Sequence, residues 1–175
     1  MTGVYIVIGL VLIFFLLSMI GPKDFAVKRT LNINRSRSDI YEYIKFLKNK
    51  NDWGPWVKKD SNIELNYSGT DGEVGFIIAW KGNKDVGEGE QEITRLVDNE
   101  RLESHLRFIK PFKSESNAFV QLEEAGVNET SVTWGIEGQN KTAFTRVIGV
   151  FMDMDKAVGK DFEAGLNNLK EILEG

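Results

Sequence analysis

The sequence has 175 residues and a formal net charge of −4. It has no cysteine and a single histidine, His105, which excludes a disulfide framework and a cysteine nucleophile and argues against a His-rich metal site or catalytic triad. This length accommodates one membrane segment and one domain of about 150 residues, so we expect no second domain. With no cysteine and one histidine, we also expect no metal or other cofactor.

Charge is distributed unevenly along the chain. Residues 1–37 contain five Lys or Arg and one acidic residue, whereas the remainder contains 17 bases and 25 acids. An acidic domain is poorly suited to contact a phosphate backbone, so we expect no nucleic-acid partner.

An apolar run from Gly3 to Ile20 opens the sequence. These 18 residues carry no charge, and a helix of this length spans about 27 Å, close to the thickness of the bilayer hydrocarbon core. A cleaved signal peptide is the alternative, but no Lys or Arg precedes the run and no small-x-small cleavage pattern follows it. We predict a retained transmembrane anchor over residues 1–22. Because the nearby bases follow the run, the positive-inside rule places the domain of residues 23–175 on the cytoplasmic side of a single-pass membrane protein.

A strand and a short helix are predicted next. Apolar and polar residues alternate from Phe25 to Asn34, which is typical of a half-buried strand. Ser36 or Ser38 can then cap a helix, which we expect to end in residues 48–52. The apolar face of this helix consists of Ile40, Tyr43, Ile44 and Leu47.

Short alternating segments separated by turn residues occupy the middle of the sequence. With the strand that begins at Phe25 they predict seven strands, in the order strand, helix, six strands and long helix. Consecutive hairpins are the simplest connection and give an antiparallel sheet whose apolar face the helices cover. The six segments are 63–67, 76–80, 86–97, 102–109, 118–122 and 132–137.

The last segment, Arg146 to Leu173, has the periodicity of one long amphipathic helix. It contains Gly149, Gly159 and Gly165, each of which costs about 1 kcal/mol in a helix interior relative to Ala, so we expect close neighbours at their backbone. The apolar stripe consists of Val147, Phe151, Met154, Val158, Phe162, Leu166, Leu169 and Leu173.

Candidate chemical groups are few. His105 falls on the polar side of its predicted strand, and we expect it to face solvent. Asp153, Asp155 and Asp161 lack the spacing of a calcium-binding loop and are expected to be solvated. Glutamates on the strands could provide acid–base chemistry, but the sequence singles out no pair. The two tryptophans of the string WGPW, residues 53–56, either plug one end of the core or border the mouth of a pocket.

Five strings carry a resemblance to a known family: WGPW (53–56), AWKGNKDVGEGEQEI (79–93), ERLESHLRFIKPF (100–112), TSVTWGIEG (130–138) and FMDMDKAVGKDFEAGLNNLK (151–170). As a set they resemble the START-like helix-grip superfamily (the SRPBCC group), and within it the polyketide-cyclase-like branch, some of whose members carry a similar N-terminal membrane segment. The resemblance covers residues 25–175. It implies an α+β fold in which a curved antiparallel sheet of about seven strands grips the C-terminal helix, with a cavity between them.

The resemblance brings no catalytic motif, because some members are cyclases and many others bind lipids, hormones or other apolar molecules without chemistry. We therefore predict a membrane-anchored domain that binds a hydrophobic small molecule or lipid. Two alternatives stay open: an enzyme of the polyketide cyclase type that uses a carboxylate in the cavity, and a protein-interaction module at the membrane whose cavity is filled by side chains. The predicted ligand-binding residues, which alternation places inward, are Trp53, Trp56, Phe76, Ile78, Trp80, Leu106, Phe108, Trp134, Phe151, Met154, Val158 and Phe162.

Overall fold

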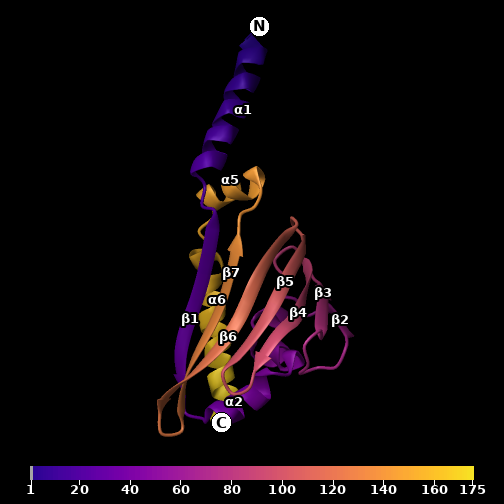
Figure 1. The fold of residues 1–175 in the computed structure, drawn as a ribbon. Helices are drawn as coiled ribbons and strands as arrows, with labels where there is room; N and C mark the ends of the chain where they lie inside the picture. The colour runs from indigo at the N-terminus through magenta and orange to yellow at the C-terminus, as the bar shows by residue number, and fades with distance from the viewer. Residues whose placement is uncertain (1) are drawn as a thin grey trace.

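A computed structural model, which describes residues 2–175, contains one seven-stranded antiparallel sheet and a long C-terminal helix, preceded by an apolar N-terminal helix (Figure 1). This confirms the predicted fold class. The strands are β1 (Asp24–Ile33), β2 (Glu64–Ser68), β3 (Ile77–Lys81), β4 (Glu88–Val97), β5 (Arg101–Lys110), β6 (Ser114–Gly126) and β7 (Glu129–Gln139). The helices are α1 (Thr2–Ile20), α2 (Arg37–Ile44), η1 (Leu47–Asn49), α3 (Lys50–Trp53), α4 (Trp56–Lys59), α5 (Ala143–Phe151) and α6 (Met154–Glu174).

The strands follow the order β1-β7-β6-β5-β4-β3-β2 across the sheet. Strands β2 to β7 pair with their neighbours in sequence, as predicted, whereas β1 closes the far edge by pairing with β7. Val27 lies opposite Ile136 in this register, and residues opposite each other point to the same face of a sheet. Both are buried with Trp134 in the core cluster that includes residues of α6.

The core lies between the sheet and α6. Trp134 of β7 stacks on Phe162 of α6, with ring centroids 4.3 Å apart and an interplanar angle of 17°. Leu166 and Leu169 continue the apolar stripe along α6 and are buried. A second, smaller cluster consists of Leu47, Phe76, Ile78 and Ile93.

Helix α2 begins where the sequence predicts but ends earlier. The Ser36 side chain accepts a hydrogen bond from the backbone N–H of Asp39, which is a helix cap. The prediction that the helix continues to residues 48–52 is wrong. The Asp71 carboxylate accepts hydrogen bonds from the backbone N–H groups of Leu47, at 2.7 Å, and Lys48, at 3.3 Å. These N–H groups are thereby satisfied outside α2, and the chain turns through η1 into α3 and α4.

The predicted single helix from Arg146 to Leu173 is two helices, α5 and α6. Met152 and Asp153 are extended between them, and the Asp153 carboxylate accepts hydrogen bonds from the N–H groups of Asp155 and Lys156. An aspartate that caps a new helix competes with continuation of the preceding one. As a result α5 departs from the line of α6 and lies beside the end of α1 (Figure 1).

Close neighbours do lie at the glycines of this region. A Cβ atom at Gly149 of α5 would lie 2.8 Å from Cγ of Pro22, which follows α1. In α6, the guanidinium of Arg29 lies against Gly159. The absence of a side chain therefore lets α5 and α6 approach their neighbours.

Helix α1 is long and apolar enough to cross a membrane, with 19 residues and no charged side chain. Ser18, which donates a hydrogen bond to the carbonyl oxygen of Phe15 at 2.8 Å, is its buried residue. The other described residues of α1 are open to the surroundings or partly covered, and its C-terminal end contacts α5.

Candidate functional site: an apolar cavity with a buried lysine

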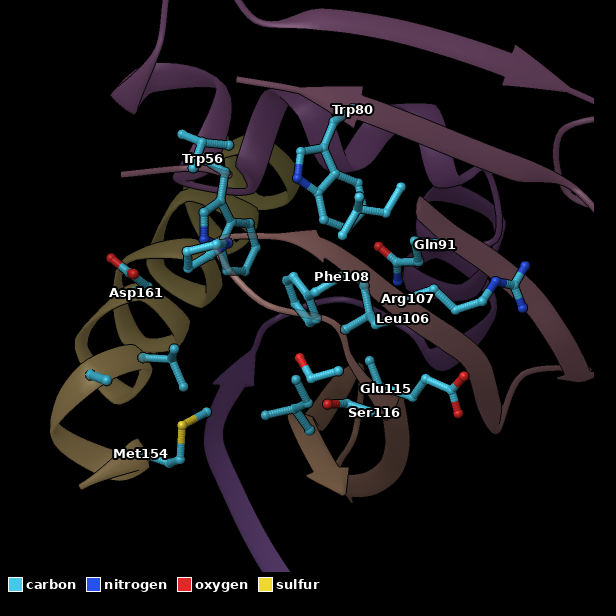
Figure 2. A pocket seen from close by; sticks show the side chains of 18 of the residues that line it. Trp56, Trp80, Gln91, Leu106, Arg107, Phe108, Glu115, Ser116, Met154 and Asp161 are labelled. Atoms are coloured by element: carbon cyan, nitrogen blue, oxygen red, sulfur yellow. The ribbon is translucent and has the colours of Figure 1, made fainter. Parts of the chain in front are cut away.

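A cavity of about 950 Å³ lies between the sheet and the layer formed by α3, α4, α5 and α6. Figure 2 shows side chains from both layers around it: Trp80 of β3 and Leu106 and Phe108 of β5 on the sheet side, and Trp56 of α4 on the helical side. Cavities that bind small molecules typically occupy about 300–1,000 Å³ and are mostly apolar. This one has the size and the walls to hold such a molecule.

Aromatic rings form much of the wall. Trp80 and Phe108 meet edge to face with centroids 5.7 Å apart, although β4 separates their strands. The intervening residue of β4 is Gly89, where a Cβ atom would lie 2.7 Å from Cζ2 of Trp80. Trp56 meets Trp134 edge to face at 5.4 Å from the other side. The lack of a side chain at Gly89 thus leaves room for the Trp80 indole.

Nine of the twelve residues predicted to bind a ligand line this cavity. Whether they bind a ligand stays a prediction, but the fold brings them together around one space. They are Trp56, Ile78, Trp80, Leu106, Phe108, Trp134, Met154, Val158 and Phe162.

The other three lie elsewhere. Trp53 is buried in the core, where its ring meets that of Trp134 at 4.7 Å. Phe76 lies just before β3 and packs in the second cluster, which covers it. Phe151 is 76% exposed, because the break between α5 and α6 removes it from the apolar stripe of α6. The two tryptophans of WGPW thus differ: Trp53 plugs the core and Trp56 borders the cavity.

A polar row crosses the inner end of the cavity, and sequence reasoning missed it. The Lys50 ammonium donates a hydrogen bond to Oε1 of Gln91 at 2.8 Å. Nε2 of Gln91 in turn donates to Oγ of Ser104 at 2.7 Å, and Ser104 lies 3.5 Å from the carbonyl oxygen of Ala118. Lys50 and Gln91 both line the cavity. Nothing in the lysine- and asparagine-rich string 48–52 predicts that one of its amines points inward.

Lys50 is held in unusual surroundings for an amine. Its side chain is partly accessible and lines the cavity, and burial among protein atoms lowers the pKa of Lys50 to about 7. The rings of Trp56 and Trp134 lie next to each other beside the amine, each with its centroid 5.2 Å from Nζ. Such cation–π contacts offset part of the cost of burying a positive charge.

Charged groups at the edge of the cavity are mostly paired. Lys59 binds Asp161 of α6 at 2.6 Å, and Arg107 binds both Glu90 and Glu92 of β4. These side chains are partly exposed and their charges are compensated locally.

His105 lies outside the cavity lining. Its Nδ1 atom is 3.0 Å from Oδ1 of Asn117 on the neighbouring strand β6. Within residues 2–175 no group of three His, Cys, Asp or Glu side chains is arranged to hold a metal ion.

The end of the cavity near α1 is bordered by α5 and the turn between β5 and β6. Pro111 and Phe112 line it from the turn, and Thr145 and Ile148 line it from α5. The rings of Phe112 and Phe144 meet edge to face with centroids 6.5 Å apart. Several apolar side chains at this end are exposed, by 47% at Ile109, 56% at Phe144, 76% at Phe151 and 42% at Met152.

The fold can be compared with those of known proteins. The chain matches neither a protein-family model nor a curated protein. Solved structures similar to it include protein Mll3558 of Rhizobium loti, with 16% identity and a TM-score of 0.62 over 85% of this chain and 96% of that one.

Two further similar structures widen the comparison. The Aha1 protein of Colwellia psychrerythraea, solved as a dimer, is 20% identical, with a TM-score of 0.59 over 86% of this chain and 96% of that one. The major latex-like protein of Panax ginseng is 10% identical, with a TM-score of 0.58 over 86% of this chain and 98% of that one. At such low identity the likeness shows the fold alone, and that fold is the helix-grip fold.

Proposed function

We propose that this protein is a membrane-anchored domain that binds a hydrophobic small molecule or lipid in the cavity between its sheet and α6. The observation that carries the proposal is the cavity itself, about 950 Å³ in volume and walled by Trp56, Trp80, Phe108 and Phe162. A core that had evolved only for stability would fill such a space, because cavities cost stability in proportion to their volume.

The membrane part of the proposal is supported by α1 and α5 together. Helix α1 has no charged residue, and α5 beside it exposes Phe144 and Phe151 and is followed by the exposed Met152. An amphipathic helix next to a spanning helix is placed to lie in the bilayer interface. The cavity end lined by α5 would then face the membrane, where apolar ligands are stored. The basic residues after α1 favour a cytoplasmic position for the domain.

Binding is tested with the full chain in lipid nanodiscs and the apolar dye Nile red. Val158→Trp and Met154→Trp would place an indole in the cavity, and we expect each to weaken dye binding by about tenfold or more. Val127→Trp is the matched control, because Val127 lies on the β6–β7 turn and is 102% exposed. Circular dichroism verifies folding. No dye binding by the unchanged protein, or full binding by both folded cavity variants, would overturn the proposal. Mass spectrometry of organic extracts would identify a co-purified ligand.

Orientation has its own test, because the chain has no cysteine. A Val127→Cys variant in intact cells should resist an impermeant thiol reagent and react after the membrane is opened. Efficient labelling of intact cells would place the domain on the outer side.

The second candidate function is an enzyme of the polyketide cyclase type, and Lys50 is the observation that favours it. An amine with a pKa of about 7 can serve as a general base at neutral pH. The carboxylates that line the cavity include Glu115 and Asp161, of which Asp161 is bound to Lys59. This candidate would be supported if the unchanged protein cyclised an apolar polyketone and the Lys50→Met variant did not. A protein-interaction module with a filled core gains no support from an open cavity.

A further inference from the structure

Lys50 is an ammonium group inside an apolar cavity with a neutral hydrogen-bond partner. Its surroundings come from three elements, Trp56 of α4, Gln91 of β4 and Trp134 of β7, and none of these neighbours carries a charge. None of the ion pairs formed by residues 2–175 includes Lys50. The positive charge therefore lacks a counter-ion within the described chain.

The Gln91 side chain is oriented so that its amide oxygen faces the Lys50 amine. Its Nε2 atom donates to Oγ of Ser104 at 2.7 Å, which leaves Oε1 to face Lys50. The glutamine thus fixes one N–H of the ammonium, which has three. The side chain lines the cavity, so a bound molecule can accept from the remaining N–H groups.

Burying an uncompensated charge is unfavourable, and proteins usually avoid it or pair it. The buried Lys50 ammonium would be stabilised by a bound anionic group. A single ammonium with a neutral amide beside it suits a monoanionic carboxylate. A dianionic phosphate is more often bound by arginine forks or several donors. Among the described residues 2–175, the one arginine on the cavity wall is Arg107, which is already held by Glu90 and Glu92.

We propose that Lys50 binds the carboxylate of an apolar acid whose hydrocarbon part lies along Trp80 and Phe108 and extends toward α5. This inference rests on the proposed function and narrows its ligand to long-chain carboxylic acids. The acid group lies beside Lys50 and Gln91, and the tail faces the end near α1.

The test compares parinaric acid, a naturally fluorescent long-chain fatty acid, with its methyl ester, on the full chain in nanodiscs. Excitation transfer from the cavity tryptophans reports binding of both. Near pH 6.5 we expect the acid to bind about 10- to 100-fold more tightly than the ester. This ratio of affinities corresponds to one hydrogen bond between charged groups. Lys50→Met should abolish this preference and leave the affinity for the ester unchanged. Lys58→Met is the matched control, because Lys58 is exposed on α4 and outside the cavity lining, and it should keep the preference.

The outcomes separate this inference from the proposed function. Equal binding of acid and ester by the unchanged protein would overturn the role of Lys50 and leave the binding function standing. A full acid preference in folded Lys50→Met would do the same. Binding of neither probe would instead count against the proposed function. The comparison of acid and ester on the unchanged protein needs no variant. Equal binding there would overturn the role of Lys50 even if Lys50→Met does not fold.

Discussion

The indole of Trp134 lies directly against the backbone of Gly165 in α6. A Cβ atom at residue 165 would come within 2.5 Å of Cζ3 of Trp134 and 3.3 Å of Cη2. Trp134 is buried and is also held by the rings of Trp53, Trp56 and Phe162. The position of α6 over the sheet, and with it the depth of the cavity beside Trp134, depends on this contact.

Gly165→Ala should therefore destabilise the protein. The added methyl group would push on an indole that cannot move freely, and overpacking of this kind costs about 1–3 kcal/mol. The gain of about 1 kcal/mol in helix propensity offsets only part of that cost. Urea unfolding of the variant should show a lower midpoint with an unchanged slope.

Gly159→Ala in the same helix is the control for this prediction. Its neighbour is the guanidinium of Arg29, the end of a long side chain that also binds Asp155 at 2.7 Å and Glu163 at 2.6 Å. These carboxylates are about half exposed, and surface ion pairs contribute about 0–1 kcal/mol. The helix gain is of similar size, so the change should stay within about 1 kcal/mol. An equal loss in both variants would show that Trp134 is not the cause.

Much of the fold could be predicted from local signals. Alternation in residues 25–34 and 132–137 reports strands with one buried face, and Ser36 is a recognisable helix cap. The break at Met152 and Asp153 escaped prediction because the apolar period of α5 runs on into that of α6. Lys50 escaped for another reason: its burial depends on α3 folding over the sheet to meet Gln91 of β4, and no short-range pattern encodes that contact.

Contact of α5 with the bilayer can be measured at Phe151. The native chain has no cysteine, so Phe151→Cys labelled with acrylodan reports from one site. We expect its emission to shift to shorter wavelength in nanodiscs, because Phe151 is exposed on the helix beside α1. The same label at Val127→Cys, on the β6–β7 turn, which points away from α1 in Figure 1, should stay in water. Identical emission from the two sites would contradict the interfacial position of α5.

The contact between Phe112 and Phe144 should slow exchange of a bound ligand. It joins the β5–β6 turn to α5 at the cavity end near α1. Phe144→Ala removes an edge-to-face pair worth about 0.5–1.5 kcal/mol, so dissociation of Nile red should become about two- to tenfold faster in stopped-flow measurements. Ile172→Ala, an exposed position near the end of α6, should leave the rate unchanged. If Phe144→Ala also left it unchanged, the ligand would leave by another route.

The buried amine should give the ligand-free protein a distinctive dependence on pH. Burial lowers the pKa of Lys50 from 10.5 to about 7, so between these values the unfolded chain holds a proton that the folded chain has released. The free energy of unfolding should then rise with pH from about 7 upward, by at most about 1.4 kcal/mol per pH unit. This measurement is confined to pH values below about 10. Burial and a hydrogen bond to Asp98 raise the pKa of Tyr41 from 10.0 to about 12, so above pH 10 the titration of Tyr41 lowers the free energy of unfolding.

Urea unfolding at intervals between pH 6 and 9.5 measures this slope. Lys50→Met should be more stable than the unchanged protein at pH 6, because it removes a charge that has no counter-ion, and the two curves should converge as pH rises. Lys58→Met, which removes an exposed lysine from α4, should run parallel to the unchanged protein. A long-chain acid that pairs with Lys50 would raise the pKa of the amine, so saturation with parinaric acid should flatten the slope and the methyl ester should not. Parallel curves for Lys50→Met and the unchanged protein would mean that the amine titrates as it does in water, and that the cavity does not isolate it.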